Sequence, residues 1–459
     1  MIAMILAGGT GTRLWPYSRS LKPKQFLNLD STHESLFQET CIRLESLISS
    51  ENIYVIGSNE HVGELRQQML QIYPHYCLEQ LLIEPLSRNT APAILWGVLQ
   101  IPENQRQEPV VVLASDHLIK APEEFVSVLK SAEKLANSGY IVTFGIQPDR
   151  PETGYGYIKS GDPLEVGFKV AEFVEKPDQA TAQKYISSKD YTWNASIFMA
   201  TAETWLNEFR KYAPKLLTAF EKKLTFGKNL YDLEMIREIY ESIEGESIDY
   251  ALLEKSKNVA VLPVEMEWSD LGSWESLFKV SKKDSHGNFL RGNVITHNTN
   301  NSLIFSGKNL VTSIGVENLI IVDTDDALLV CDMNCSQDVK KLVETLKRED
   351  RQEYKFHTTV KGPWGSATTI LENEGCRIRM LELMPGESMP SQCHKQSSEN
   401  WVVLQGIANV QRGDEKLLLK ENESAYIPKG VPHQLGNLEK NTLHIIEVQQ
   451  GQYLGTDDV

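Results

Sequence analysis

The chain of 459 residues is too long for one ordinary domain, and its length predicts about three. It is 41% hydrophobic and 24% charged, which is typical of a globular protein. A net charge of −16 argues against a protein whose main task is to hold nucleic acid, although it leaves room for a local basic pocket.

The six cysteines form no CxxC pair, so we expect reduced thiols in the cytoplasm. The apolar run "MIAMILA" has no basic leader and is too short for a signal peptide or a membrane span. We therefore expect no membrane partner.

Residues 1–284 alternate short strands with amphipathic helices, which predicts an α/β domain. The expected strands are rich in Val and Ile, and the last expected helix ends at a capping glycine, Gly139. Such alternation predicts parallel βαβ units in a doubly wound sheet, with ligands at the carboxyl ends of the strands. The expected strands are 2–7, 52–57, 109–116 and 140–146, and the expected helices are 35–49, 93–100 and 123–139.

Residues 285–336 have no helical period and are punctuated by turn residues. Apolar side chains recur every six residues there, which predicts a short parallel β-helix of the left-handed type; an ordinary β-meander is the alternative. A charged linker helix at 337–355 and an all-β sandwich or barrel at 356–459 follow. The repeated positions are Ile304, Leu310, Val316, Val322 and Leu328.

The segment Gly8–Arg13, "GGTGTR", directly follows the first expected strand. It is neither a Walker A loop nor a dinucleotide fingerprint. A tight turn would explain the glycines, but it would not explain Arg13 and the nearby Lys24. Backbone N–H groups and cations together indicate a bound phosphate.

Further polar residues follow other expected strands. Asp116 ends the strand "PVVVLA", and Asp270 lies in "EWSDLGSW"; two such carboxylates can hold Mg²⁺. Glu175 and Lys176 end another strand, and Asn194 is suited to a hydroxyl group. Each alone is more often structural, but together they predict a pocket for phosphates, a metal ion and a sugar.

Eight motifs occur in this order along the chain: "LAGGTGTRLWPYSRSLKPKQF", "EPLSRNTAPAI", "SDH", "GYGYI", "FVEKP", "WNASIF", "SIDYALLEK" and "EWSDLGSW". Together they resemble the bacterial mannose-1-phosphate guanylyltransferases (GDP-mannose pyrophosphorylases). The chain is most similar to the long type, which carries a C-terminal cupin domain like that of phosphomannose isomerases. The resemblance implies a Rossmann-like nucleotidyltransferase domain, then the β-helix and the cupin-like barrel.

The resemblance implies a reaction in which mannose 1-phosphate attacks the α-phosphorus of GTP and expels pyrophosphate. It implies that Asp116 and Asp270 hold Mg²⁺, and that Arg13, Lys24 and Lys176 are catalytic. The implied nucleotide site comprises Leu6, Ala7, Gly8, Gly9, Thr10, Gly11, Thr12, Arg13, Lys24, Arg88, Asn89, Thr90 and Asp116. The implied sugar-phosphate site comprises Gly156, Glu175, Lys176 and Asn194.

The C-terminal segment contains a candidate metal-ligand set at cupin spacing: Gln392, His394, Glu399 and His433. Two ligands at i and i+2 point to the same side of a strand, and this donor set favours Zn²⁺ or another divalent ion. The alternative is a polar barrel mouth without a metal.

Isomerase domains of this family usually read close to Q-x-H-H-H-R-x-E-H-W at this site. Here Lys395, Gln396, Ser397 and Asn400 replace His, His, Arg and His. Isomerisation needs a base and a cationic grip on the 6-phosphate, so we expect this activity to be absent and the domain to be structural or oligomeric.

Three other interpretations stay open. The enzyme could use another sugar 1-phosphate or another nucleotide, or it could be bifunctional and also isomerise mannose 6-phosphate. A different class would be a non-catalytic sensor of nucleotide sugars, which the cations and acids of the pocket argue against. We expect a homodimer because the β-helix and the C-terminal domain resemble assembly surfaces.

Overall fold

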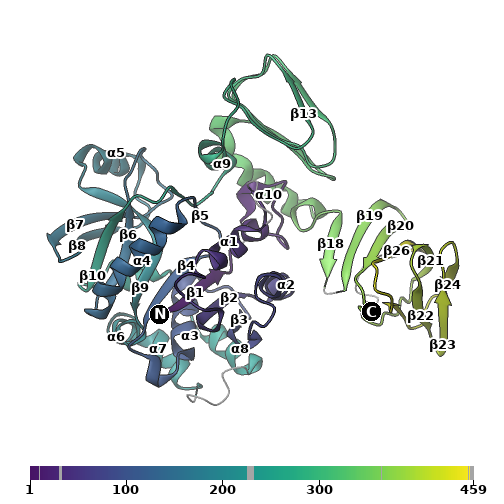
Figure 1. Cartoon of the computed structure of the whole chain (residues 1–459), viewed down its shortest axis with the longest axis horizontal. Helices are drawn as coiled ribbons and strands as arrows, with labels where there is room; N and C mark the ends of the chain where they lie inside the picture. Colours follow the sequence, from purple (N-terminus) through teal and green to yellow (C-terminus); the bar gives the residue numbers. More distant parts are fainter. Residues whose placement is uncertain (10, 30–33, 225–231, 363, 453, 455–459) are drawn as a thin grey trace. The chain divides into compact units, whose positions relative to one another are not determined.

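The computed structural model describes residues 1–9, 11–29, 34–224, 232–362, 364–452 and 454. The chain divides into two compact units (Figure 1). The first comprises Met1–Ser306, Leu310–Val322 and Leu329–Thr345, and the second comprises Gly307–Asn309, Asp323–Leu328 and Leu346–Val459. Within the described residues, no helix is both long and apolar enough to cross a membrane.

The described part of the first unit contains a nine-stranded sheet, which confirms the α/β domain but corrects its topology. The strands β3, β2, β1 and β4 are parallel, but β9 runs antiparallel to both β4 and β6. The expectation of purely parallel βαβ units is therefore wrong at the centre of the sheet. In spatial order the strands are β3 (Leu81–Glu84), β2 (Ile53–Ser58), β1 (Ile2–Ala7), β4 (Pro109–Ala114), β9 (Tyr191–Thr201), β6 (Ile141–Ile146), β10 (Val259–Val264), β8 (Phe168–Val174) and β7 (Tyr157–Pro163).

Helices cover both faces of this sheet because successive strand residues alternate between two apolar cores. Ile2 and Met4 of β1 pack with one group of helices, and Ala3 and Ile5 pack with the other. The first group is α3 (Thr90–Gln100), α6 (Ala202–Tyr212), α7 (Pro214–Glu221) and α8 (Leu233–Ser242). The second group is α1 (Leu36–Ile42), α2 (Val62–Ile72) and α4 (Pro122–Asn137).

The expected helix boundaries hold at α4 but not at α1. The chain turns into the left-handed region at Gly139 (φ +87°), just beyond the end of α4. The helix expected over 35–49 ends at Ile42, after a capping box between Ser35 and Gln38 at its start. The remaining helices of the sheet domain are α5 (Gln179–Ser188) and α9 (Trp274–Val280).

Short parallel strands follow the sheet domain and form a β-helix, which excludes the meander (Figure 1). Val294 pairs with Val311 and Ile304 pairs with Ile321, so one coil takes 17 residues. The strict six-residue repeat is wrong, because Leu310 and Leu328 are more than half exposed. The strands are β12 (Phe289–Arg291), β13 (Val294–His297), β14 (Leu303–Phe305), β15 (Val311–Ile314), β16 (Leu319–Asp323) and β17 (Leu328–Asp332).

The expected charged helix is α10 (Val339–Arg348), and the strands that follow form the cupin-like barrel from two antiparallel sheets. Leu381, Trp401, Val403 and Leu435 are among the buried residues of its core. The strands are β18 (Thr359–Gly362), β19 (Gly365–Asn373), β20 (Cys376–Leu383), β21 (Ser397–Gln405), β22 (Ala408–Arg412), β23 (Glu415–Leu419), β24 (Ser424–Ile427), β25 (His433–Asn437) and β26 (Leu443–Gly451).

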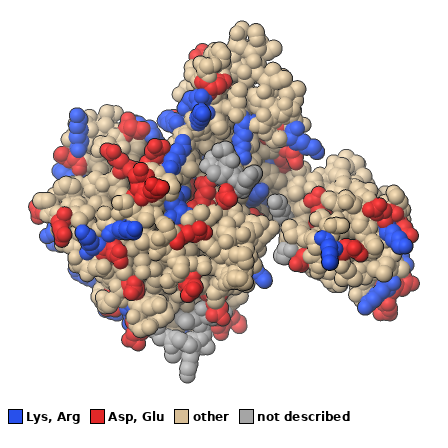
Figure 2. Space-filling view, viewed as in Figure 1, with Lys and Arg blue, Asp and Glu red and all other residues tan. Residues whose placement is uncertain are grey.

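Charges of both signs are interspersed over the face shown in Figure 2, and Lys and Arg do not gather there into one basic surface.

Candidate active site

A pocket of about 590 Å³ opens at the carboxyl ends of β1, β3 and β4. Of the predicted nucleotide-binding residues, seven line it: Leu6, Gly8, Gly9, Arg88, Asn89, Thr90 and Asp116. Further lining residues include Gln25, Glu84, Ser115, Ser196, Phe198, Gly245 and Asp249. The carboxyl edge of the sheet, where the sequence predicts ligands, is thus the edge that carries the pocket.

Gln25 holds the glycine loop in place. Its Nε2 donates to the carbonyl oxygens of Ala7 (3.1 Å) and Gly9 (2.9 Å). Gly11 has φ +46°, and a Cβ there would lie 2.6 Å from the Lys24 Cβ. Only glycine fits this close approach in the left-handed region. Predicted Thr10 lies outside the described residues.

Arg13 and Thr12 belong to a short helical turn, Thr12–Leu14, after the loop. Arg13 is exposed, and neither residue is among those that line the pocket. The structure therefore does not bring the predicted phosphate-binding arginine to the pocket wall.

Lys24 is buried and links the two predicted metal ligands. Its Nζ lies 2.8 Å from Asp116 Oδ2 and donates to the backbone carbonyl of Asp270. Burial opposes the ionisation of Asp116, but the Lys24 ammonium and His117 outweigh it and hold the pKa of this carboxyl below its usual value. Asp116 is therefore an anion at neutral pH.

Two short strands bring Asp116 and Asp270 together. β5 (Leu118–Ile119) pairs antiparallel with β11 (Trp268–Ser269), so the acid that precedes β5 and the acid that follows β11 meet at the same end. Trp268 Nε1 donates to His117 Nδ1 at 3.2 Å and fixes this crossing. Carboxylates are hard oxygen donors of the kind that Mg²⁺ prefers.

The predicted sugar-phosphate residues meet beside this pocket. Lys176 forms an ion pair with Glu175, and Asn194 donates its backbone N–H to the carbonyl of Gly156 at 2.8 Å. A Cβ at Gly156 would lie 2.6 Å from Glu175 Oε2, so the glycine makes room for the carboxylate. The group is connected to the pocket through Asp249, which lines it.

The side chain of Asn194 makes three hydrogen bonds, and one N–H of its amide has no partner among the described residues. Its Oδ1 accepts from Thr143 Oγ1 (2.9 Å) and from Ser196 N–H (3.0 Å), while its Nδ2 donates to Asp249 Oδ1 at 3.2 Å. Burial, and then Glu175, raise the pKa of Asp249 to about 7. Asn194 therefore orients Asp249, which sequence reasoning missed although it lies in the quoted motif "SIDYALLEK".

The residues expected near the base occupy the start of α3. Arg88 Nε donates to the Tyr240 carbonyl at 2.8 Å, and Asn89 Oδ1 caps the helix by accepting from Thr90 N–H at 2.9 Å. Thr90 Oγ1 accepts from the N–H of Ile248 at 2.9 Å. These contacts hold the helix start against the segment before Asp249.

Glu84 is a second residue that sequence reasoning missed. It ends β3, lines the pocket and accepts from the Tyr240 hydroxyl at 3.1 Å. Burial raises its pKa to about 7, only partly offset by that hydrogen bond. It is the first residue of the quoted motif "EPLSRNTAPAI", so its place at a strand end was the available signal.

Strained backbone marks the same region. Asn89, Lys176, Ser196 and Leu271 all have positive φ, between 43° and 68°. Non-glycine residues adopt this region only where their surroundings enforce it, most often at functional sites. The strain agrees with a built site at this edge of the sheet.

In the barrel, His394, Glu399 and His433 form a buried cluster whose ligand atoms lie within 4.8 Å of one another. Glu399 accepts from Trp401 Nε1 at 3.0 Å. Within the described residues, His394 Nδ1 and Nε2, Glu399 Oε1 and His433 Nε2 have no hydrogen-bond partner, although two of them are only 3.0 Å apart. Buried polar atoms without partners fit a bound cation.

The fourth predicted ligand, Gln392, joins this cluster through its backbone. Its N–H donates to the His433 carbonyl at 2.9 Å, and the His433 N–H donates back at 2.8 Å. The structure thus places Gln392 next to the cluster.

Sequence reasoning also missed an arginine and an acid of this barrel. Arg379 Nε lies 2.5 Å from Oε1 of Glu447, which is almost completely buried. The barrel therefore does contain a cationic side chain and a carboxylate, but the two form an ion pair with each other. Nothing in the alternation of these strands distinguished them from surface residues.

The fold and this pocket define a nucleotidyltransferase with two appended β domains. Residues 2–287 match the family model "Nucleotidyl transferase", 292–346 match "MannoseP isomerase/GMP-like beta-helix domain", and 349–459 match "Mannose-6-phosphate isomerase C-terminal".

Similar proteins narrow this class. The chain is 41% identical over 464 residues to "Mannose-1-phosphate guanylyltransferase" of Klebsiella pneumoniae, covering 100% of this chain and 98% of that protein. It is also 41% identical over 463 residues to "Xanthan biosynthesis protein XanB" of Xanthomonas campestris pv. campestris (strain B100), covering 100% and 97%. A solved structure, a "mannose-1-phosphate geranyltransferase" from Thermus thermophilus, has a TM-score of 0.66 and 31% identity, covering 75% of this chain and 99% of that one. The chain belongs to the mannose-1-phosphate guanylyltransferase family.

Proposed function

We propose that the protein transfers the guanylyl group of GTP to α-D-mannose 1-phosphate, giving GDP-mannose and diphosphate for polysaccharide biosynthesis. The observation that carries this proposal is the pocket at the carboxyl edge of the sheet. The glycine loop and Asp116 line it, and the buried Lys24 joins Asp116 to the backbone carbonyl of Asp270. Membership of the family supports it.

In the proposed reaction, an oxygen of the sugar phosphate forms a bond to the α-phosphorus of GTP, and the bond from that phosphorus to the β-phosphate oxygen breaks. The bonding pair leaves with diphosphate. The attacking oxygen is already an anion, so no covalent enzyme intermediate is required. The protein has to align two anions and neutralise the charge between them.

In this proposal Gly8 and Gly9 present backbone N–H groups to the phosphates, together with Leu6, Ala7, Thr10, Gly11 and Thr12. Arg88, Asn89 and Thr90 face the base. Gly156, Glu175 and Lys176 bind mannose 1-phosphate together with Asp249, and Asn194 belongs to this site because it orients Asp249. Arg13, Lys24 and Lys176 supply the catalytic positive charge, with Arg13 turning in from the exposed position that it has here.

Asp116 and Asp270 are the residues that would hold Mg²⁺, since the pairing of β5 with β11 brings their positions in the chain to the same end of these strands. A bound Mg²⁺ polarises the phosphoryl oxygens and offsets their charge. Lys24 keeps Asp116 ionised and fixes the backbone of Asp270, so both acids are oriented before substrate arrives.

The test measures pyrophosphate release with GTP, ATP, CTP or UTP against mannose 1-phosphate or glucose 1-phosphate. We expect turnover with GTP and mannose 1-phosphate that exceeds every other pair. Asp270→Asn should reduce it by a factor on the order of 10²–10³, while exposed Asp162→Asn serves as the control. Absence of GTP-dependent turnover with mannose 1-phosphate would refute the proposal, and unchanged nucleotide binding with no turnover in any pair would favour a sensor.

We further propose that the barrel holds one divalent ion, Zn²⁺ or another, through His394, Glu399, His433 and Gln392, without isomerase turnover. The orphaned atoms of the cluster support the ion, and the mutual pairing of Arg379 and Glu447 supports the lack of turnover. Elemental analysis should find one such ion per chain. A coupled assay with mannose 6-phosphate and added Zn²⁺, Co²⁺ or Mn²⁺ should find no activity; measurable activity would make the enzyme bifunctional.

A cytoplasmic homodimer completes the proposal. The six cysteines are free, which agrees with a reducing compartment. Light scattering on the eluted protein should give twice the chain mass of 51.9 kDa, and a monomer mass would reject the dimer.

A further inference from the structure

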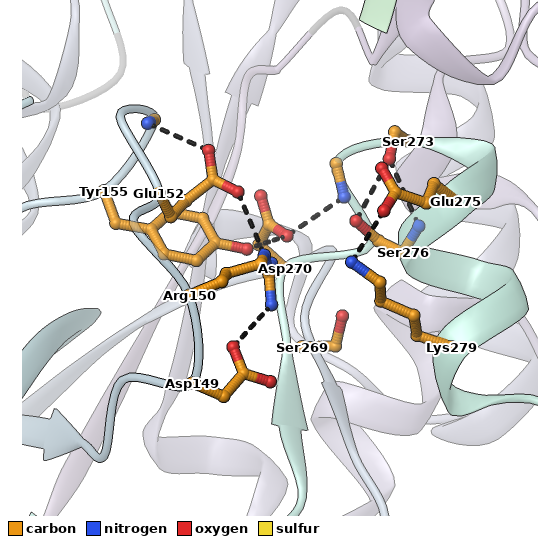
Figure 3. Close-up of polar contacts among 12 residues, drawn as sticks. Asp149, Arg150, Glu152, Tyr155, Ser269, Asp270, Ser273, Glu275, Ser276 and Lys279 are labelled. Carbon is orange, nitrogen blue, oxygen red and sulfur yellow. Dashed lines mark hydrogen bonds and ion pairs between the residues drawn. The ribbon is translucent and has the colours of Figure 1, made fainter. Parts of the chain in front are cut away.

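Asp270 is held by one of its two carboxylate oxygens. The Tyr155 hydroxyl donates to Asp270 Oδ1 at 2.6 Å, and the Gly272 N–H donates to the same oxygen at 3.1 Å (Figure 3). Among the described residues, Oδ2 accepts no hydrogen bond. The two donors therefore divide the carboxylate into one oxygen bound to the protein and one left for a cation.

Tyr155 is itself fixed by its surroundings. Its ring packs edge-on against Trp193 and Trp268, with centroids 5.2 and 5.4 Å away. The loop before it is closed by Glu152, which accepts from the Arg150 Nε (3.3 Å) and from the Gly154 N–H (3.1 Å) (Figure 3). A side chain held on three sides can hold another.

A tyrosine hydroxyl ordinarily keeps its proton up to about pH 10, so Tyr155 is the donor in this bond and the Asp270 carboxylate is the acceptor. Its hydrogen bond to a carboxylate is charge-assisted, and 2.6 Å is the length of such a bond.

The segment around Asp270 is shaped to suit this arrangement. Leu271 is completely buried with φ +43°, a strained conformation for a branched residue. A Cβ at Gly272 would lie 2.5 Å from Asp270 Oδ2, so a larger residue there would displace the free oxygen. The backbone carbonyl of Asp270 accepts from Lys24.

We propose that Tyr155 is a positioning residue that turns Asp270 so that Oδ2 is the oxygen offered to the catalytic metal ion. The proposal rests on the proposed function, in which Asp270 holds Mg²⁺. A hydrogen bond from a neighbour to a metal-ligating carboxylate typically changes metal affinity or activity by about 10- to 100-fold. Nothing in the motif "GYGYI" distinguishes this role for the first tyrosine from core packing.

A role in packing alone makes a different prediction. Phenylalanine at 155 keeps the ring and its contacts with Trp193 and Trp268 but cannot donate to Asp270. If Tyr155 only fills space, Tyr155→Phe behaves like the wild type towards metal. If it positions Asp270, the ion binds more weakly although the fold is intact.

The experiment compares Tyr155→Phe with Tyr157→Phe, which removes the hydroxyl of a buried tyrosine in the same motif. Mn²⁺ binding is measured by electron paramagnetic resonance with saturating GTP and no sugar phosphate, so that no turnover occurs. The Mg²⁺ dependence of pyrophosphate release is measured in parallel. We expect Tyr155→Phe to lower the affinity for Mn²⁺ about 10- to 100-fold. The Mg²⁺ concentration that gives half-maximal pyrophosphate release should rise by the same factor, and activity should recover at high Mg²⁺.

Tyr157→Phe should leave both measurements unchanged. Asp270→Asn separates the two proposals. If it weakens Mn²⁺ binding while Tyr155→Phe stays within twofold of wild type, the positioning role is wrong and the metal assignment stands. If Asp270→Asn binds Mn²⁺ like the wild type, the metal assignment itself is wrong. Gly272→Ala is the second variant should Tyr155→Phe fail to fold; it should weaken Mn²⁺ in the same way, and wild-type binding would count against the proposal.

Discussion

The nucleotide pocket and the cluster in the barrel both gather acids with basic side chains, but they satisfy them differently. In the pocket, the Lys24 ammonium lies 2.8 Å from the Asp116 carboxylate, and the surrounding amides are hydrogen-bonded. In the barrel, Glu399 lies 3.0 Å from His394 Nε2 and 3.5 Å from His433 Nε2, and His394 Nδ1 has no hydrogen-bond partner among the described residues. The acid of the pocket is therefore compensated by a permanent cation of the fold, whereas the acid of the barrel faces two imidazoles, which are also common metal ligands.

The largest expected effect comes from breaking the ion pair of the pocket. Lys24→Met leaves the Asp116 carboxylate without its cation, which should cost about 3–5 kcal/mol of unfolding free energy in urea titrations at pH 7. Because the pKa of Asp116 is held low, the pair contributes above pH 4 and its contribution disappears as acid protonates the carboxylate.

The difference between Lys24→Met and wild type should therefore shrink below pH 4. The exposed Lys120→Met serves as a control for loss of a positive charge. An equal loss of stability at pH 3 and pH 7 would mean that lost packing, rather than lost charge, explains the effect.

Glu84 sharpens the comparison because it is a carboxyl in the same pocket whose one hydrogen-bond partner among the described residues is the Tyr240 phenol. Burial raises its pKa to about 7 from 4.5, so folding takes up a proton between these values and stability falls as the pH rises through them. Glu84→Gln can still accept from Tyr240 and removes this dependence. Between pH 4.5 and pH 8, the unfolding free energy of Glu84→Gln should rise relative to that of the wild type by up to about 3 kcal/mol.

Urea titrations across that range check the slope, with the exposed Glu165→Gln as the matched control. Parallel slopes for Glu84→Gln and wild type would show that Glu84 ionises normally.

Asp116 and Asp270 show how much of the site could be predicted from the sequence. Asp116 and Asp270 were predicted because each follows a recognisable strand or motif, yet the two-residue strands β5 and β11 that join them were not predicted. Pairs this short leave no hydrophobic period. The antiparallel β9 was missed for a related reason, since a strand buried on both faces reads the same in either direction.

The barrel cluster was the easier prediction, because His394 and Glu399 lie close in sequence and His433 follows at cupin spacing. Glu84, Asp249 and Tyr155 lay inside quoted motifs but received no role. Their importance depends on burial and on partners far away in the sequence, such as Tyr240 for Glu84. Periodicity carries no information on such partners.

A smaller effect is expected from the barrel. His433→Leu should lower the affinity of the barrel for the divalent ion about 10- to 100-fold, which competition with a chromophoric chelator measures. In metal-free protein the same change should lower the unfolding free energy by only about 1 kcal/mol, because it removes the hydrogen bond between His433 Nδ1 and the Val431 carbonyl (2.9 Å) and the contact of Nε2 with Glu399 Oε2 at 3.5 Å.

His444→Leu is the matched control, since this histidine lies on β26 outside the cluster and should leave metal binding unchanged. Loss of several kcal/mol in the metal-free protein would show that the cluster is itself part of the fold, and the contrast with the pocket would disappear.

The smallest effect is expected at Thr143, which is completely buried and donates to Asn194 at 2.9 Å. Thr143→Val keeps the shape and removes one of the two hydrogen bonds to Asn194 Oδ1, which should cost about 1 kcal/mol of stability. Ser196 N–H still holds Asn194, and Asn194 still donates to Asp249. The KM for mannose 1-phosphate should therefore rise less than about fivefold, since 1 kcal/mol corresponds to about that factor.

Thr40→Val is the comparison, because Thr40 makes a buried hydrogen bond of similar length, 2.9 Å, to Leu36 in α1. Thr40→Val should lower the unfolding free energy by the same amount as Thr143→Val without changing the affinity for substrate. If Thr143→Val alone raised KM by about two orders of magnitude, Asn194 would touch the sugar directly and depend on Thr143 for its orientation. The pocket would then hold a ligand-binding amide of the kind predicted from the sequence, instead of one that only orients Asp249.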